Sequence, residues 1–413
     1  MDRKVNIAVI IETELWNGGN FQVELSSALR FKNNKEFSDF NILFFSTNKN
    51  NISILSNYKI ESEYISINYI DNLISFLRRK IFNVKLRKIF NFFFGTSKLE
   101  NILLKKNIDI IHFNTVSKFA LHLEKISYGV TYWDSNHLEY PEFPESHANN
   151  RFEYRELSYS SILKKSTYII SDCEESILNL TKRYNVIREK IYKIYSLPSV
   201  EVRNFNDSNF NENWDLIKKK YNLFSPYIFY PAQLWPHKNH IFILKGLQLL
   251  RDKYNMTIKA VFTGRDAYEN INYLKKISKN LGLEKQIIFT GLVENKEIPY
   301  LYKSSIALVM PTYCGPTNLP PLEAFFLETP VIYSEHFFNC DQLGDSFLPI
   351  KLDDPNTLAV AVLKLMKEKN LKRDLIKKGN IIKDRLINND KESINIYKKI
   401  FNSFSLKREC WEK

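Results

Sequence analysis

Cysteine is scarce in this sequence, and long apolar runs are missing from it. Its 413 residues include four cysteines, which lie far apart with no C-x-x-C spacing. That pattern argues against a disulfide framework or a zinc site and fits a reducing compartment. The first residues lead straight into an apolar strand without a signal-peptide core or cleavage site. No apolar run approaches the ~18 residues of a membrane span. We therefore expect a cytoplasmic protein whose membrane contact, if any, is peripheral.

Size and charge set two further bounds. A chain of 413 residues is too long for one typical core, so two domains are expected, and 44% hydrophobic content with 30 Phe and 23 Tyr can fill both. Lys and Arg outnumber Asp and Glu by 59 to 46, and the net charge of +13 suggests an anionic partner or surface. An AT-rich genome would give the same Lys and Asn bias, so the charge alone does not identify the partner.

Strand-like and helix-like segments alternate along the chain, and the alternation starts twice. Strand, helix and strand are predicted first over 4–12, 21–30 and 41–46, and the second series begins with a strand over 227–231 and a helix over 240–250. Such β-α-β order implies parallel sheets. The last predicted helices cover 360–367, 371–382 and 392–403.

The domain boundary is predicted in Glu201–Asn213, which is rich in asparagine and has no apolar periodicity. The predicted fold class is α/β, with an N-terminal domain over 1–200, a linker over 201–225 and a C-terminal domain over 226–388. A C-terminal helix is predicted over 389–413, and it could cross back to the N-terminal domain.

The stretch Pro311–Pro330, PTYCGPTNLPPLEAFFLETP, lies between two strand-like segments. Its double proline favours the first turn of a helix, which would place Glu323 in that turn, at the positive end of the helix dipole. A strand, a loop and a helix N-terminus at the edge of an α/β sheet form a site for an anionic ligand. The alternative is a short surface helix in which Glu323 stabilises the N-terminus and binds no ligand.

Two other loops at strand ends are candidates for the same site. Gly18 and Gly19 follow the first strand and would let a backbone approach a phosphate or sugar closely; a bare turn is the alternative. Lys238 follows the strand over 227–231, and its ammonium suits a phosphate. One solvated loop lysine among many is the other interpretation.

An acidic loop, Asp134–Glu145, follows the strand-like segment Gly129–Trp133. Titratable side chains at the carboxyl end of a sheet strand are where α/β folds place their chemistry, and Asp134 and His137 are the candidates here. Metal ligation is not expected because only one histidine lies close to the carboxylates. A surface acidic loop remains the alternative.

The segment Leu73–Phe94 has basic residues, no acidic ones, and apolar residues at helical spacing. A basic amphipathic helix of this kind suits an anionic membrane surface. The alternative is a helix that packs its apolar side on the domain core. The basic residues are Arg78, Arg79, Lys80, Lys85, Arg87 and Lys88.

Several segments resemble the retaining, nucleotide-sugar-dependent glycosyltransferases of GT-B fold that share a Glu-x7-Glu motif ("group 1" type). They are YPAQLWPHKN, AVFTG, IIFTGLVENKEIPYLYKSSIALVMPTY and NLPPLEAFFLETPVIYSE, in that order. The form GPTNLPPLEA resembles a subgroup among bacterial surface-polysaccharide transferases. The resemblance covers most of the chain and is strongest over 227–380.

The resemblance implies two Rossmann-like domains that face a cleft, with the acceptor on the N-terminal side and the donor bound by 226–388. It implies that Glu323 binds the nucleotide ribose, that Lys238 binds the diphosphate, and that the glycine loop at Gly18 and Gly19 closes on the donor. No metal is expected, because fixed positive groups and backbone amides replace it, and no other cofactor is expected, since the nucleotide sugar is a substrate. The loop expected to hold the donor sugar and phosphate comprises Gly315, Pro316, Thr317, Asn318 and Leu319.

Three positions depart from the family pattern. Gly315 stands where the first Glu of the motif is expected, and Gln233 stands where an arginine usually binds phosphate. Trp133 replaces a histidine, which leaves Asp134 and His137 to position the donor sugar or the acceptor. Recognition of the donor sugar must therefore differ in detail.

The function expected from this resemblance is retaining transfer of a hexose from a nucleotide sugar to a saccharide or lipid-linked acceptor. The setting would be bacterial polysaccharide synthesis (O-antigen, capsule or lipopolysaccharide) at the inner face of the cytoplasmic membrane. A nucleotide-sugar epimerase or hydrolase of the same fold is an alternative. A basic membrane- or nucleic-acid-binding module is another, although the sequence has no nucleic-acid motif.

Overall fold

The computed structural model describes residues 4–14, 18–32, 35–81, 83–315, 318–337 and 340–411. The chain divides into two compact units. Unit 1 contains residues 1–133, 153–195 and 389–413, and unit 2 contains residues 134–152 and 196–388.

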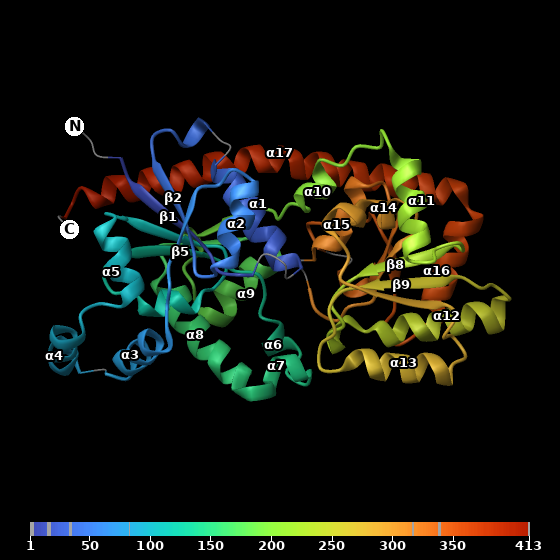
Figure 1. Cartoon of the computed structure of the whole chain (residues 1–413), viewed down its shortest axis with the longest axis horizontal. Helices are drawn as coiled ribbons and strands as arrows, with labels where there is room; N and C mark the ends of the chain where they lie inside the picture. Colours follow the sequence, from blue (N-terminus) through green and yellow to red (C-terminus); the bar gives the residue numbers. More distant parts are fainter. Residues whose placement is uncertain are drawn as a thin grey trace. The chain divides into compact units, whose positions relative to one another are not determined.

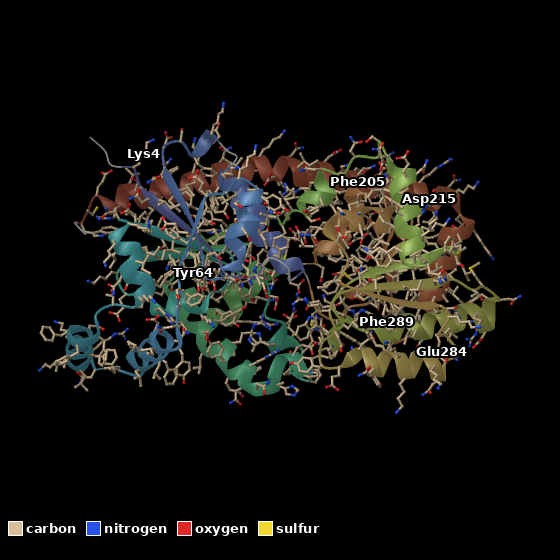
Figure 2. All side chains as sticks on the ribbon, viewed as in Figure 1. Lys4, Tyr64, Phe205, Asp215, Glu284 and Phe289 are labelled. Carbon is tan, nitrogen blue, oxygen red and sulfur yellow. The ribbon has the colours of Figure 1, made fainter. Side chains whose placement is uncertain are left out.

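Unit 1 is built on a seven-stranded parallel sheet with the order β3-β2-β1-β4-β5-β6-β7. Its interior strand β1 is buried because both faces of a parallel sheet are covered: Ile7 to Ile11 have no measurable exposure. Tyr64, labelled in Figure 2, lies on the edge strand β3 and is 43% exposed. The strands are β1 (Asn6–Ile11), β2 (Asn41–Ser46), β3 (Ser62–Tyr64), β4 (Ile110–Phe113), β5 (Ser127–Thr131), β6 (Tyr168–Ser171) and β7 (Ile191–Lys193).

The helices of unit 1 connect successive strands, as parallel pairing requires. The glycine pair lies where α1 begins: Gly18 has φ +70°, and α1 starts at Gly19. The α-helices are α1 (Gly19–Lys32), α2 (Asn50–Asn57), α3 (Tyr69–Lys80), α4 (Val84–Phe94), α5 (Lys98–Lys105), α8 (Arg151–Lys165, whose first two residues belong to unit 2) and α9 (Glu174–Tyr184).

Unit 2 is built on a six-stranded parallel sheet with the order β10-β9-β8-β11-β12-β13. Figure 2 labels Phe289 on its edge strand β10. The strands are β8 (Tyr227–Pro231), β9 (Lys259–Thr263), β10 (Ile287–Gly291), β11 (Leu308–Met310), β12 (Val331–Ser334) and β13 (Leu348–Ile350). Two parallel α/β sheets confirm the predicted fold class.

The helices of unit 2 cover both faces of its sheet. Figure 1 shows α12 and α13 along one face and α14 and α15 on the other. This follows from right-handed crossovers, because the chain moves outward through β9 and β10 and then returns to start outward again at β11. The α-helices are α6 (Asn136–Glu139), α7 (Pro144–His147), α10 (Val200–Arg203), α11 (Phe210–Lys220), α12 (His240–Tyr254), α13 (Asn270–Asn280), α14 (Ile298–Lys303), α15 (Leu319–Phe326) and α16 (Asn356–Lys367).

The last helix, α17 (Lys369–Arg408), is a single continuous element in Figure 1. The prediction of two helices over 371–382 and 392–403 was wrong, because residues 383–391 contain no glycine or proline and the helical hydrogen bonds continue through them. Residues of α17 up to Asn388 cluster with unit 2, and those from Asn389 cluster with unit 1. In unit 1, Arg30 Nε pairs with Asp390 Oδ1 at 2.7 Å.

The predicted linker 201–225 is largely ordered and belongs to unit 2. It holds α11 and packs by aromatic contacts: the ring of Phe205, labelled in Figure 2, lies 5.0 Å from that of Tyr300. Asn213 Nδ2 also donates to the Tyr300 hydroxyl at 2.9 Å. The asparagines that suggested a loop thus flank or enter a short helix.

The single basic helix predicted over Leu73–Phe94 is two helices, α3 and α4. The prediction was wrong because Asn83 acts as the N-cap of α4, where its Oδ1 accepts the N–H groups of Lys85 and Leu86. Gly95, at φ +63°, ends α4. Among the described residues, every helix is too short or too polar to cross a bilayer.

Candidate functional site

The sheet of unit 2 has its topological switch between β8 and β11. From β8 the chain proceeds outward to β9 and β10, and from β11 it proceeds the other way to β12 and β13. In an open parallel sheet, ligands bind outside the carboxyl ends of the strands at such a switch. The loops that follow β8 and β11 carry Lys238 and Asn318.

The structure brings Lys238 and Asn318 into contact. Lys238 Nζ donates to Asn318 Oδ1 at 3.0 Å. Asn318 Nδ2 in turn donates to the Tyr333 hydroxyl at 2.7 Å and to the Cys314 carbonyl at 3.1 Å. Asn318 is 8% exposed, so its amide is fixed with its oxygen toward the lysine. These contacts place an oriented cation at the switch point.

Burial governs the electrostatics of this cation. It lowers the pKa of the Lys238 ammonium to about 8, although the carboxylates of Asp134 and Glu145 act in the opposite direction. The ammonium therefore remains mainly charged at pH 7. Burial also raises the pKa of the Cys314 thiol to about 12, so this side chain is neutral. A half-buried cation whose hydrogen bond goes to the neutral amide of Asn318 favours an anionic ligand.

The backbone of the loop after β8 is fixed at several points. The Tyr230 hydroxyl donates to the Lys238 carbonyl at 3.0 Å, and Asn239 has φ +55°, which ends the short 3-10 helix Pro236–Lys238 before α12. On the neighbouring loop, a Cβ added to Gly264 would lie 2.5 Å from the Ala232 carbonyl oxygen. Glycine at 264 thus permits the ends of β8 and β9 to approach closely.

Gly315 is glycine because an aromatic ring occupies the adjacent space. A Cβ at this position would lie 2.0 Å from the Phe337 ring. That ring stacks on Tyr333, with centroids 4.9 Å apart. The glutamate expected at Gly315 has therefore no room for its side chain in this conformation.

Glu323 lies on α15 but not where the sequence predicted it. The helix begins at Leu319, one residue before the double proline, so Glu323 is its fifth residue and the first turn holds no acid. The prediction of a first-turn position was wrong. Glu323 Oε2 accepts from the Tyr302 hydroxyl at 2.9 Å, and Ser199 donates through its side chain and backbone. Burial raises the pKa of this carboxyl despite these hydrogen bonds.

The acidic loop belongs to unit 2. Asp134 Oδ1 accepts the N–H of Asn136 at 3.0 Å, and His137 is buried with its ring 5.6 Å from that of Phe152. Burial alone would raise the pKa of the Glu145 carboxyl, but hydrogen bonds from His237 hold it below its usual value. Burial lowers the pKa of His237 itself, so a charged carboxylate accepts from a neutral imidazole.

The remaining predicted donor residues are placed as follows. Gln233 Oε1 accepts from Trp235 Nε1 at 2.6 Å, and Leu319 is buried at the start of α15. Pro316 and Thr317 lie outside the described residues. Gly18 and Gly19 are exposed in unit 1, near a β1 loop whose N–H groups at Glu12 and Thr13 are held by Glu24 Oε2.

The predicted membrane residues fall into three groups. Lys85 and Lys88 are exposed on α4. Arg87 instead pairs with Glu124 at 2.8 Å, within unit 1. The side chains of Arg78, Arg79 and Lys80 lie outside the described part of the chain. Within that part, no three His, Cys, Asp or Glu side chains cluster in a way that could hold a metal ion.

Sequence reasoning missed the residues that hold the site together. Tyr302, Tyr333 and Phe337 reach it from three different elements, and no spacing rule connects them to Glu323 or Gly315. His237 could have been found, because it precedes Lys238 in the same loop. Glu145 was recognised as part of the acidic loop, but its contact with His237 was not predicted.

Comparisons with known proteins find a match in the part of the chain that contains the loops after β8 and β11. Residues 215–381, which lie within unit 2, match the family model for glycosyl transferases group 1. The chain is 30% identical over 184 residues to the O-antigen chain mannosyltransferase RfbU of Salmonella typhimurium strain LT2, covering 45% of this chain and 46% of the relative. It is 23% identical over 225 residues to the O-antigen chain mannosyltransferase B of Escherichia coli, covering 54% and 58%. The chain thus spans about half the length of the curated relatives it matches.

A solved structure extends the likeness to both units. Anabaena HepE in complex with UDP-glucose has a TM-score of 0.69 at 11% identity, over 95% of this chain and 99% of that one. At such low identity the likeness shows the fold alone. The two parallel α/β sheets match those of GT-B glycosyltransferase structures, which confirms the predicted GT-B class.

Proposed function

We propose that this protein is a glycosyltransferase that uses a nucleotide-diphosphate sugar, with the donor bound at the β8–β11 switch of unit 2. The observation that carries the proposal is the half-buried, oriented ammonium of Lys238, held by Asn318 at 3.0 Å. The glycosyl transferases group 1 domain spans this site. The UDP-glucose complex of HepE, which has the same fold, supports a nucleotide sugar as the donor.

The donor sugar is proposed to leave its nucleotide with retention at the anomeric carbon. The bond between that carbon and the phosphate oxygen breaks, and charge develops on the nucleoside diphosphate. Lys238, the Leu319 N–H and the positive end of the α15 dipole would stabilise this charge, since Pro320 and Pro321 have no N–H. The acceptor hydroxyl forms the new bond on the same face, and its proton passes to the departing phosphate oxygen. Asp134 or His137 would position the donor sugar or the acceptor, and turnover is expected to persist in EDTA.

The acceptor is proposed to be a growing bacterial surface polysaccharide, either a saccharide or a lipid-linked one. Two of the curated relatives are O-antigen chain mannosyltransferases, which makes a mannosyl donor the first candidate for this chain. An epimerase or hydrolase of the same fold remains the alternative: it would convert or release the sugar stoichiometrically in the absence of any acceptor.

Binding of the donor can be tested by thermal unfolding, since a ligand that binds only the folded state raises the apparent stability. A panel should include GDP-mannose and UDP-glucose, with wild type, Lys238→Ala and Glu323→Gln compared. We expect one nucleotide sugar to raise the Tm of wild type and to do so far less in both variants. Equal shifts in all three proteins would overturn the assigned site.

We further propose that the chain works at the cytoplasmic face of an anionic membrane, through α3 and α4. Their exposed apolar side chains include Tyr69 (80% exposed), Phe92 (84%) and Phe93 (72%). Lys85 and Lys88 lie on the same helix as the last two. Apolar side chains beside lysines fit the interface of an anionic bilayer. In Figure 1, α3 and α4 lie at the edge of unit 1, below α5 and to the left of α8.

Flotation with vesicles of phosphatidylglycerol and phosphatidylethanolamine tests this surface. Lys85→Glu with Lys88→Glu should abolish recovery with the vesicles, and so should Phe92→Ser with Phe93→Ser. The matched control is Lys275→Glu with Lys276→Glu, a pair of exposed lysines on α13. Unchanged recovery of the α4 variants would refute the membrane proposal.

A further inference from the structure

Residues Asp134–Phe152, which we name the strap, belong to unit 2 although the chain on both sides of them belongs to unit 1. The strap contains the short helices α6 and α7. The chain could connect β5 to α8 without leaving unit 1, since β5 and nearly all of α8 belong to that unit. Its contacts within unit 2 gather at the loop that carries Lys238.

The main polar contact of the strap is with His237, the neighbour of Lys238. Glu145 Oε1 accepts the backbone N–H of His237 at 3.0 Å and also pairs with its Nδ1. The two side chains are 12% and 16% exposed. On the other side, the His237 carbonyl accepts the backbone N–H of Tyr313 at 3.0 Å. His237 is therefore fixed at its N–H, its ring and its carbonyl.

Aromatic contacts connect the strap to the loops after both switch strands. The Phe143 ring lies 6.2 Å from the ring of His237 and 5.6 Å from that of Tyr313. Tyr140 lies 6.2 Å from Tyr313. At the far end of the strap, Arg151 Nη1 donates to the Tyr268 hydroxyl at 2.9 Å. The strap thus contacts the loop of Lys238 and the loop that leads to Asn318.

We propose that Glu145 is a positioning residue for Lys238: by holding His237 it fixes the lysine ammonium where the donor diphosphate binds. The inference rests on the proposed function of Lys238 and adds a residue to its site. Fixing the peptide before Lys238 leaves only the lysine's own side-chain torsions to be ordered. Loss of Glu145 frees the loop, and the cost of ordering it then falls on ligand binding.

The test is isothermal titration calorimetry, which measures the affinity of the full chain for UDP and for GDP. For whichever diphosphate wild type binds, Glu145→Ala should weaken binding about tenfold. Glu145→Gln keeps an acceptor oxygen for His237 and should stay within about threefold of wild type. The control is Glu142→Ala, which removes an exposed carboxylate from the same strap and should leave binding unchanged.

A double-mutant cycle separates positioning from general damage. If Glu145 acts through the lysine, Glu145→Ala should have no further effect in a Lys238→Ala background. Additive losses would show a structural role and overturn the inference. Should Glu145→Ala fail to fold, Glu145→Asp, whose shorter carboxylate does not reach His237, replaces it with the same expected loss.

The outcomes distinguish this inference from the function on which it rests. Wild-type binding that Lys238→Ala weakens and Glu145→Ala does not would overturn the inference and leave the donor site standing. Wild type that binds neither UDP nor GDP would contradict the donor site itself, and the inference with it.

Discussion

The Phe337 ring occupies the space beside the Cα of Gly315 that any side chain at that position needs: an added Cβ would lie 2.0 Å from it. Gly315→Ala should therefore destabilise the protein by about 1–3 kcal/mol, since the stacked pair of Phe337 and Tyr333 must move. Thermal or urea unfolding measures this. In a Phe337→Ala background the same substitution should cost far less, and equal costs in both backgrounds would show that the ring is not the obstacle.

Tyr333 holds the amide of Asn318 through a hydrogen bond of 2.7 Å. Tyr333→Phe removes its hydroxyl and leaves a buried N–H with one partner fewer, at a cost of about 1 kcal/mol of unfolding free energy. The affinity for a nucleoside diphosphate should fall as well, because the Asn318 oxygen is no longer directed at Lys238. A variant with wild-type affinity would mean that the amide does not orient the lysine.

Burial lowers the pKa of Lys238 to about 8, and only the charged form attracts phosphate. The terminal phosphate is fully ionised above about pH 7. From there the affinity for a nucleoside diphosphate should change little up to about pH 8 and then fall by up to about tenfold per pH unit. Lys238→Arg keeps its charge and should abolish this fall. Asn318→Asp places a carboxylate beside the ammonium, which raises the lysine pKa, so the fall should begin at a higher pH. Identical pH profiles for wild type and Lys238→Arg would contradict the assignment.

Burial raises the pKa of Glu323 above its unfolded value. The folded chain thus binds this proton more tightly than the unfolded chain, and the contribution to stability is present at low pH and lost as pH rises from about 4.5 through the raised value. Glu323→Gln does not titrate. Without ligand, it should match wild type near pH 5 and be at least as stable at pH 7, while it binds nucleotide sugars poorly. A variant that is less stable at pH 7 than at pH 5, relative to wild type, would contradict this.

The Tyr302 hydroxyl donates to Glu323 at 2.9 Å in a buried setting. Tyr302→Phe should cost about 1.5–3 kcal/mol of unfolding free energy at a pH high enough to ionise Glu323, because the carboxylate then loses a donor. The loss should shrink at low pH as the carboxyl becomes protonated. Stability curves at pH 5 and pH 7.5 measure the difference, and a loss independent of pH would indicate simple packing.

Sequence patterns located most strands of both sheets, because buried parallel strands such as 4–12 and 227–231 are short apolar runs with turns after them. They also located the switch loops, since Lys238 and Asn318 lie in the loops that follow two predicted strands. They missed the three-residue edge strands β3, β7 and β13. Local signals were weaker at helix boundaries. The N-cap at Asn83 divided one predicted helix, and the start of α15 at Leu319 moved Glu323 out of the first turn.

Contacts between residues far apart in the chain could not be predicted. Phe337 explains why residue 315 is glycine, yet nothing in the sequence near either residue indicates that they meet. The same holds for Glu145 and His237, which are separated by 92 positions. Such partners are set by how the loops pack, and only the folded chain shows them.

The central claim is that Lys238 at the β8–β11 switch binds the diphosphate of a sugar donor that the protein consumes. The most direct measurement is release of nucleoside diphosphate from a panel of UDP- and GDP-linked sugars, with wild type and Lys238→Ala side by side. We predict turnover of at least one donor and a loss of about 100-fold or more in kcat/KM for the variant. Turnover by wild type that Lys238→Ala leaves intact, or no turnover of any donor, would contradict the account.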